Sequence, residues 1–399
     1  MDKNKYENLV TPCFILDKGM LVRSIREFRA ALDEYFPRNT IGYSVKTNSL
    51  PTALVIAREA GCDAEVVSHD EYQLARLCGF TPDRIIYNGP MKSKETFLEA
   101  ITGDACVNIE TQREIEWLKE LPEDGQYDVG IRLNVDITEV SPDDGKPGEE
   151  FSRFGFCFEN GELEAAIRRI QALPNVHVAG LHLHRTSKTR STRFYANLIK
   201  YASGVIDSLG LKLKWLDIGG SYFGIFPNAP TFEDYAKAIY EAMPKGLDLT
   251  KLNVIVEPGN ALLAAAFSYL STVIDVKRLE NVTVVTTDGT RNDVDPLFAK
   301  KDYLKEILYR HKTSDTVARQ WICGATCLEF DRLFELTGQP ALSIGDKILY
   351  NNVGAYTMCL TPMFINYFPR VYLLENGKYT LTRAKWGAEE CLIKSNLEQ

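Results

Sequence analysis

The chain has 399 residues, of which 45% are hydrophobic and 25% charged, and its formal net charge is -8. An acidic chain lacks the basic face that neutralises nucleic-acid phosphates, so we exclude nucleic acid as a partner and expect a small molecule. The N-terminal segment is too polar for a signal peptide, and no apolar run is long enough for a membrane span, so neither secretion nor membrane insertion is expected.

The nine cysteines are scattered along the chain and form no CxxC pair. Neither a disulfide framework nor a zinc site is therefore expected, and no metal is predicted. Reduced thiols are typical of the cytoplasm, which is the predicted location.

Strands and helices are predicted to alternate through the first two thirds of the chain. A strand at 11–17 precedes a helix at 20–36, in which apolar residues such as Leu21, Ile25 and Phe28 recur at helical spacing. From residue 40 onwards eight short strands are predicted with helices between them, and eight is the number that closes a (β/α)8 barrel. These strands are expected at 40–46, 63–67, 84–87, 105–109, 127–135, 177–183, 213–218 and 252–256.

The alternation ends near Asn260. Beyond it, β-rich segments follow one another without regular helices, which predicts a second, mostly antiparallel β domain. The strand near residue 13 has no place in the barrel and is expected to join this domain. The predicted fold is α/β, with a (β/α)8 barrel over residues 26–261 and a β-rich domain built from residues 1–25 and 262–399.

Residues 141–150 form a polar, acid-rich segment that also contains proline and glycine. Two interpretations stay open for it, a mobile loop over the catalytic face of the barrel and a solvated linker.

Lys46 ends the first barrel strand, at the edge where barrel enzymes place their catalytic residues. A lysine held among apolar neighbours favours the neutral amine, which can form a Schiff base with an aldehyde. A single lysine is more often a solvated surface charge, so the other strand ends must supply the evidence. They carry Glu65, His184, Glu257 and the pair Gly219-Gly220, whose turn lets backbone amides approach an anion closely.

The motifs occur in a specific order: YSVKTN (43–48), AEVVSHDE (64–71), NGPMKS (88–93), GLHLH (180–184), LDIGGSY (216–222), VEPGN (256–260), CGATCLEFD (323–331) and GAYT (354–357). From Thr11 to about Arg383, this order resembles the fold type III pyridoxal-phosphate decarboxylases, the family of diaminopimelate, ornithine and arginine-type decarboxylases. The resemblance implies an alanine-racemase-type barrel with a β domain that uses both chain ends. It also implies pyridoxal 5'-phosphate as cofactor, an amino acid as substrate, and a homodimer with shared active sites.

The resemblance also implies residue roles. Lys46 is similar to the Schiff-base lysine, His184 to the ring that stacks on the pyridine, and Glu257 to the partner of the pyridine nitrogen. Glu65 takes the place of an acid that supports the cofactor ring from the side. Cys327 matches the cysteine that reaches into the neighbouring subunit's site and protonates the carbanion after carbon dioxide leaves. The implied phosphate contacts are Ser187, Gly219, Gly220 and Tyr356, with backbone near Gly259.

Each role has a structural alternative. Glu257 is otherwise a helix-capping acid, and Cys327 a small buried hydrophobe. His184 is otherwise a core histidine, and His182, on the same strand face, competes with it for the stacking role. A carboxylate at Glu257 keeps the pyridine nitrogen protonated, which favours decarboxylation over racemisation, because alanine racemase has an arginine there.

Three departures from the family pattern concern the substrate. Asn260 replaces the usual arginine, Leu328 replaces the acid that often follows the cysteine, and Arg185-Thr186 interrupts the usual segment after His184. The nearest acids to Leu328 are Glu329 and Asp331, which we predict to contact substrate. A standard diaminopimelate decarboxylase is therefore not expected.

A basic cluster follows His184, made of Arg185, Lys188, Arg190 and Arg193. One interpretation is a solvated loop. The other is that Arg185 and Arg190 bind a substrate carrying extra carboxylate or phosphate, with Arg185 replacing the arginine missing at residue 260.

The predicted function is pyridoxal-phosphate-dependent α-decarboxylation of a polar amino acid in a specialised pathway such as siderophore or antibiotic assembly. The alternatives are a racemase or another pyridoxal enzyme of the same fold, and a catalytically silent regulator descended from a decarboxylase.

Overall fold

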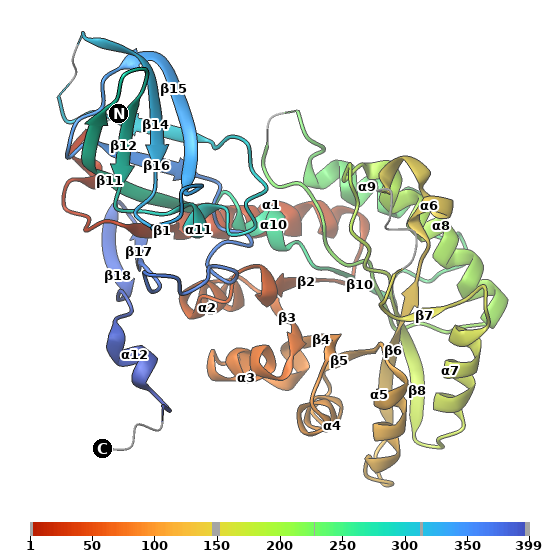
Figure 1. Cartoon of the computed structure of the whole chain (residues 1–399). Helices are drawn as coiled ribbons and strands as arrows, with labels where there is room; N and C mark the ends of the chain where they lie inside the picture. The colour runs from red at the N-terminus through yellow and green to blue at the C-terminus, as the bar shows by residue number, and fades with distance from the viewer. Residues whose placement is uncertain (1–2, 146–151, 227, 312–313, 396–399) are drawn as a thin grey trace. The chain divides into compact units, whose positions relative to one another are not determined.

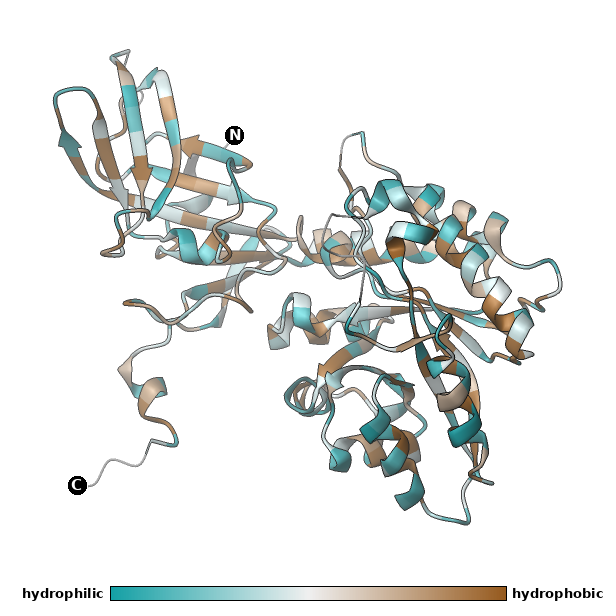
Figure 2. Cartoon of the chain, turned by 45° about the vertical axis from the view of Figure 1, so that its right-hand side comes forward, coloured by the Kyte–Doolittle hydropathy of each residue, from teal (hydrophilic) through white to brown (hydrophobic). Residues whose placement is uncertain are grey.

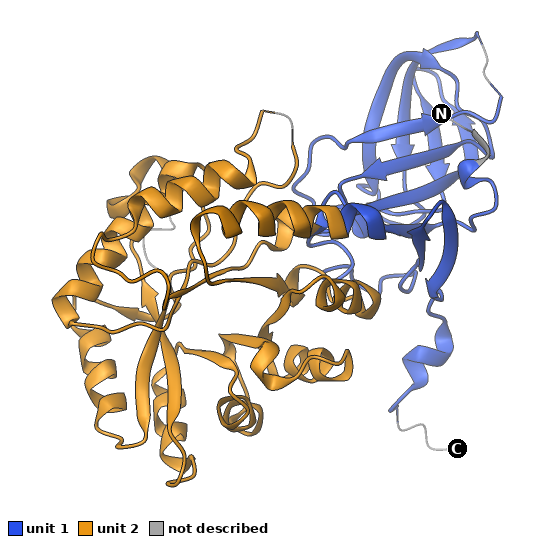
Figure 3. Ribbon diagram, turned by 180° about the vertical axis from the view of Figure 1, so that it is seen from behind, with its two compact units in different colours: residues 1–21, 263–399 blue, residues 22–262 orange. Residues whose placement is uncertain are grey.

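The computed structural model describes residues 3–145, 152–226, 228–311 and 314–395. They form two compact units (Figure 3). Unit 1 contains residues 1–21 and 263–399, and unit 2 contains residues 22–262.

Unit 2 is built on a closed ring of eight parallel strands, which confirms the predicted barrel. The ring runs from β2 through β3, β4, β5, β6, β8 and β9 to β10, which pairs with β2 again. The two-residue strand β7 (Phe156–Cys157) pairs with β6 outside the ring. The ring strands are β2 (Asn39–Ser44), β3 (Asp63–Ser68), β4 (Ile85–Met91), β5 (Cys106–Ile109), β6 (Tyr127–Asn134), β8 (Val176–His182), β9 (Trp215–Asp217) and β10 (Asn253–Val256).

Helices surround the ring of strands (Figure 1). Figure 2 shows that they carry brown apolar and teal polar stretches, as expected of helices with one face against a sheet. In the helix at 162–171, Leu163, Ala166, Ile167 and Ile170 are buried, which is the spacing of a single face. The helices are α1 (Lys18–Tyr35), α2 (Pro51–Glu59), α3 (His69–Leu77), α4 (Lys94–Thr102), α5 (Gln112–Trp117), α6 (Ile137–Val140), α7 (Glu162–Gln171), α8 (Thr192–Leu209), α9 (Phe232–Ala242) and α10 (Gly259–Leu263), with 3-10 helices η2 (Val45–Thr47), η3 (Pro82–Arg84), η4 (Leu118–Glu120) and η5 (Pro142–Asp144).

Unit 1 is a nine-stranded, mostly antiparallel sheet, as predicted. The N-terminal strand β1 lies inside it, antiparallel to β11 and parallel to β17, which confirms that both chain ends build this sheet. Its strands are β1 (Cys13–Asp17), β11 (Phe267–Arg278), β12 (Thr283–Thr287), β13 (Lys305–Leu308), β14 (Thr316–Cys323), β15 (Arg332–Pro340), β16 (Lys347–Asn351), β17 (Arg370–Glu375) and β18 (Lys378–Arg383), with helices η1 (Lys3–Tyr6), α11 (Arg291–Val294) and α12 (Ala388–Leu392).

Part of the predicted loop 141–150 is ordered by specific contacts. Residues 142–144 form η5, and Asp144 is fully buried. Residues 146–150 lie outside the described part of the chain. Among the helices that the structure describes, none is both long enough and apolar enough to cross a membrane.

Candidate active site

Lys46 and Glu65 meet at the C-terminal edge of the barrel. Ser44, the last residue of β2, is the register partner of Glu65 on β3, and Lys46 follows two residues later in η2. Nζ of Lys46 donates to Oε2 of Glu65 at 2.5 Å, and Oγ of Ser44 donates to the same oxygen at 2.8 Å. The Lys46 side chain is 31% exposed and that of Glu65 only 1%. The amine is thus held by a buried acid while part of it stays accessible.

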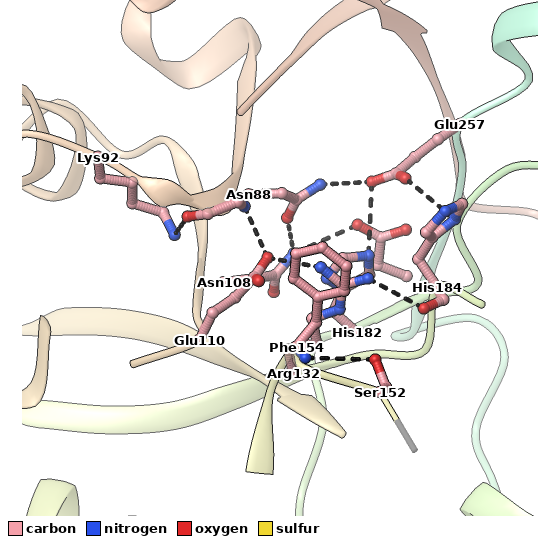
Figure 4. Close-up of polar contacts among 12 residues, drawn as sticks. Asn88, Lys92, Asn108, Glu110, Arg132, Ser152, Phe154, His182, His184 and Glu257 are labelled. Atoms are coloured by element: carbon pink, nitrogen blue, oxygen red, sulfur yellow. Dashed lines mark hydrogen bonds and ion pairs between the residues drawn. The ribbon is translucent and has the colours of Figure 1, made fainter. Parts of the chain in front are cut away.

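Glu257 follows β10, and only β2 separates this strand from β3, which carries Glu65; one amide links the two acids. Nδ2 of Asn88 donates to Oε1 of Glu257 at 2.5 Å and to Oε1 of Glu65 at 3.3 Å (Figure 4). The Glu257 side chain therefore faces the network and does not cap α10, which rules out the capping interpretation. Asp217, the last residue of β9, hydrogen-bonds to Glu257 as a second buried acid.

The carboxyl pair Asp217 and Glu257 holds a proton near neutral pH. Burial raises the pKa of Asp217 to about 7. Burial, followed by the negative charges of Asp217 and Glu65, raises the pKa of Glu257 well above its usual range. Such a pair can keep or release a proton at small energetic cost.

His184 is the accessible imidazole of the two on this strand. Its side chain is 24% exposed, whereas that of His182 is 2% exposed. The backbone N–H of Gly220 donates to Nδ1 of His184 at 3.0 Å, so this nitrogen carries no proton. Burial and then the charge of Arg132 hold the pKa of His184 well below its usual range. A neutral ring is suited to stacking on a flat ligand.

His182 lies behind His184 and close to the acid pair. Nε2 of His182 lies 3.8 Å from Oε1 of Glu257. Neither His182 ring nitrogen has a hydrogen-bond partner among the described residues. Burial holds its pKa well below the usual range, so His182 is neutral.

The turn at Gly219 and Gly220 lies against both His184 and Glu257. Gly219 has φ +76°, and a Cβ there would lie 2.6 Å from Cβ of His184, so only glycine fits. The Gly219 carbonyl accepts a hydrogen bond from the Glu257 amide at 2.9 Å. Two further predicted phosphate contacts belong to the neighbouring loops: Ser187 is buried after β8, and Gly259 begins α10 after β10.

The basic cluster is not a uniformly solvated loop. Arg193 pairs with Asp143 at 3.0 Å, and the Arg190 guanidinium lies 5.1 Å from the ring centroid of Phe223. Arg185 is half-buried and Lys188 is exposed. Arg193 is thus occupied by an internal ion pair, and we consider the remaining three cations for substrate binding.

The other predicted residues belong to unit 1. Cys327 and Glu329 are exposed, so the interpretation of Cys327 as a buried hydrophobe is wrong. Tyr356 is 44% exposed and has φ +54°. Asp331 is buried, and its carboxylate accepts hydrogen bonds from Arg291 N at 2.8 Å and Thr326 Oγ1 at 2.6 Å. These contacts favour a supporting role for Asp331 in the loop that carries Cys327, in place of the predicted substrate contact.

Several buried polar residues of the site were not predicted from the sequence. Arg132 on β6 donates to Oε1 of Glu110 at 2.9 Å and to the carbonyl of His184 at 3.0 Å, which fixes the backbone beside that ring. A polar residue inside an otherwise apolar barrel strand is the signal that would have indicated such positions. The residues concerned are Asn88, Asn108, Glu110, Arg132 and Asp217.

Comparison with known proteins identifies the family of the chain. The family model for the pyridoxal binding domain of pyridoxal-dependent decarboxylases matches residues 20–264. A diaminopimelate decarboxylase of Actinosynnema pretiosum is 29% identical over 355 residues, covering 87% of this chain and 79% of that protein. Antizyme inhibitor 2 of Xenopus laevis is 27% identical over 411 residues, covering 97% of this chain and 84% of that protein.

The fold itself is also found among solved structures. The diaminopimelate decarboxylase of M. jannaschii superposes with a TM-score of 0.87 at 21% identity, covering 100% of this chain and 94% of that one. The family match extends over more than half of the chain and includes Lys46, Glu65, His184 and Glu257. The chain therefore belongs to the family of pyridoxal-dependent decarboxylases, carboxy-lyases whose cofactor is pyridoxal phosphate.

Proposed function

We propose that this chain removes the α-carboxylate of a polar amino acid. The observation that carries the proposal is the 2.5 Å contact between Lys46 and Glu65, joined through Asn88 to Glu257. An amine and two acids converge at the C-terminal edge of a barrel, where enzymes of this architecture place their chemistry.

The residues fit pyridoxal phosphate. Lys46 offers an amine for its aldehyde, the face of the neutral His184 ring is suited to its pyridine, and Glu257 is an acid for the pyridine nitrogen. The turn at Gly219 and the loop at Ser187 offer backbone and hydroxyl donors to a phosphate. When bound, the cofactor supplies a ring that accepts the electron pair left on Cα as carbon dioxide departs.

The side chains then have distinct tasks. Glu65 holds the Lys46 amine in place, and Glu257 holds a proton at the pyridine nitrogen, which strengthens the ring as an electron acceptor. His184 excludes water from one face of the ring. We assign the return of a proton to Cα to Cys327 of a second copy, which makes the working form a homodimer, and we place the protein in the cytoplasm.

The substrate is proposed to carry an additional acidic group. Three cations of the loop after β8, Arg185, Lys188 and Arg190, lie at the same end of the barrel as Lys46. An acid that would hold a second ammonium is absent at Leu328, directly after Cys327. A distal carboxylate suits this charge pattern better than a distal amine does.

A substrate screen tests this proposal. The purified protein, loaded with pyridoxal phosphate, is given D and L forms of diaminopimelate, ornithine, lysine and carboxylated amino-acid conjugates, and carbon dioxide release is measured. We expect release from a carboxylated substrate and none from the Lys46→Ala variant. Inversion of configuration without carbon dioxide would indicate a racemase and contradict the proposal.

A second candidate function is regulation of another protein, favoured by the similarity to antizyme inhibitor 2. Retention of Lys46, Glu257 and Cys327 argues against it, because binding another protein does not require an amine held by a buried acid. Failure to bind pyridoxal phosphate, together with no carbon dioxide release from any amino acid, would support regulation.

A further inference from the structure

Four polar side chains form a continuous chain of hydrogen bonds through the interior of the barrel. Nε1 of Trp215 donates to Oδ1 of Asn108 at 3.2 Å. Nδ2 of Asn108 donates to Oδ1 of Asn88 at 2.8 Å, and Nδ2 of Asn88 donates to Oε1 of Glu257 at 2.5 Å. Figure 4 shows Asn108, Asn88 and Glu257 in this order. All four are buried, so water does not compete for these contacts.

The direction of this chain follows from the chemistry of Trp215. An indole N–H can donate but cannot accept, so Asn108 must turn its oxygen towards Trp215 and its NH2 group towards Asn88. Asn88 must then accept with its oxygen and direct its own NH2 group at the acids. Each amide uses both of its hydrogens, since Asn108 also donates to Asp217 at 3.2 Å and Asn88 also donates to Glu65 at 3.3 Å.

The barrel backbone is shaped to admit the contact between Trp215 and Asn108. Asn108, Gly130, Gly180 and Trp215 are register partners in one row across β5, β6, β8 and β9. A Cβ on Gly180 would lie 2.0 Å from Nε1 of Trp215, and a Cβ on Gly130 would lie 2.0 Å from Oδ1 of Asn108. The neighbouring strands β6 and β8 therefore have glycine at the positions where the indole of Trp215 and the amide of Asn108 meet.

We propose that Trp215, Asn108 and Asn88 are positioning residues that direct an N–H donor at Glu257 and so favour its ionised form as the partner of the pyridine nitrogen. This inference rests on the proposed function for the role of Glu257. Hydrogen bonds donated to a carboxylate favour its charged form. With the direction fixed, Asn88 cannot turn its oxygen towards Glu257, an arrangement that would favour the neutral acid.

The carboxyl cluster has other titratable and charged neighbours. They are Lys46, Glu65, Cys106, Arg132, His182, His184 and Tyr222. The two histidines have pKa values well below their usual range and Cys106 and Tyr222 well above theirs, so these four side chains stay neutral near pH 7. Burial and neighbouring negative charges raise the pKa values of both acids, and the hydrogen bonds donated by Asn88 and Asn108, together with the positive charge of Lys46, favour the ionised forms against this effect.

The test replaces Trp215 by phenylalanine, which removes the N–H and frees Asn108 to rotate. In the loaded enzyme we expect the pH midpoint of the cofactor's visible absorbance to fall by roughly half a unit to one unit, because a less ionised Glu257 holds the ring proton less firmly. We expect kcat to fall about three- to tenfold with KM within about twofold. Trp117→Phe, on α5, is the matched control and should behave as the wild type.

A second measurement needs no cofactor. Without donated hydrogen bonds, Asp217 and Glu257 retain their protons to higher pH, so the cofactor-free Trp215→Phe protein should lose more thermal stability between pH 5 and pH 8 than the wild type. Asn108→Leu removes the donors directly without adding a charge and should exceed Trp215→Phe in both measurements. If thermal stability depends on pH equally in Trp215→Phe and wild type, Trp215 does not position the donor on Glu257 and the inference is wrong. Wild-type protein that binds no pyridoxal phosphate would instead overturn the proposed function. If Trp215→Phe does not fold, Asn108→Leu decides on the same measurements.

Discussion

The buried carboxylate of Asp144 accepts a hydrogen bond from the hydroxyl of Ser191, which lies 47 residues further along the chain, at 2.9 Å. Ser141 donates to the same carboxylate at 2.6 Å, and the Thr189 hydroxyl also donates to it. The carboxylate therefore joins the segment after β6 to the loop that carries Ser187 and the N-terminus of α8. It holds the proposed phosphate-binding loop in place.

Replacing Asp144 by asparagine should destabilise the protein by about 1–3 kcal/mol, the usual cost of disrupting a buried, charge-assisted hydrogen-bond cluster. Urea unfolding at neutral pH measures this change in the free energy of unfolding. Asp143→Asn is the matched control, because its side chain is 76% exposed, and it should have little effect. Equal stability of the two variants would show that the cluster does not hold the loop.

The same contact has a defined pH dependence. Burial by itself would raise the pKa of Asp144, but the hydrogen bonds from Ser141, Thr189 and Ser191 outweigh burial and lower it. An acid with a lowered folded-state pKa contributes stability that is complete above its unfolded pKa, about 3.9, and is lost as pH falls through the folded value. The difference between wild type and Asp144→Asn should therefore be constant near neutral pH and shrink in acid.

The acids under the site should have the opposite pH dependence. Burial raises the pKa of Asp217 to about 7, so the folded state keeps a proton that the unfolded state releases near pH 4. Stability of the cofactor-free protein should fall as pH rises from about 4 through about 7. Asp217→Asn should flatten this dependence, and melting temperatures from pH 5 to pH 8 measure it. A profile that rises with pH in wild type and is unchanged in the variant would contradict the assignment.

Lys46 should be indispensable for holding the cofactor. Lys46→Ala should lose the visible absorbance of bound pyridoxal phosphate and reduce carbon dioxide release to background, because no other amine replaces the one at the end of β2. Absorbance spectra of the reconstituted protein measure it. Lys94→Ala, which removes a surface lysine paired with Glu120, should match the wild type.

The main features of unit 2 could be predicted because they depend on local patterns. Eight apolar strand segments, separated by segments with helical periodicity, predict a parallel barrel. Residues at the strand ends then meet at one edge, as Lys46 and Glu65 do. The contacts of Asp144 and Arg193 could not be predicted, because they join residues about fifty positions apart through loops without periodicity. Asn108 is a polar residue within the short strand β5, but its partners lie on other strands, so its hydrogen bonds could not be predicted from the sequence.

Arg185 should contribute to substrate affinity more than to the rate of chemistry. It follows His184 directly, and a guanidinium there can bind a distal carboxylate equally well in the ground state and the transition state. Arg185→Ala should therefore raise KM for a carboxylated substrate by roughly tenfold or more while kcat changes little. Steady-state kinetics with the substrate found in the screen measure it, and Arg168→Ala, on the exposed face of α7, is the control. An unchanged KM would show that Arg185 has no role in substrate recognition. A KM that rises equally for a substrate without the distal carboxylate would show that Arg185 supports the loop instead.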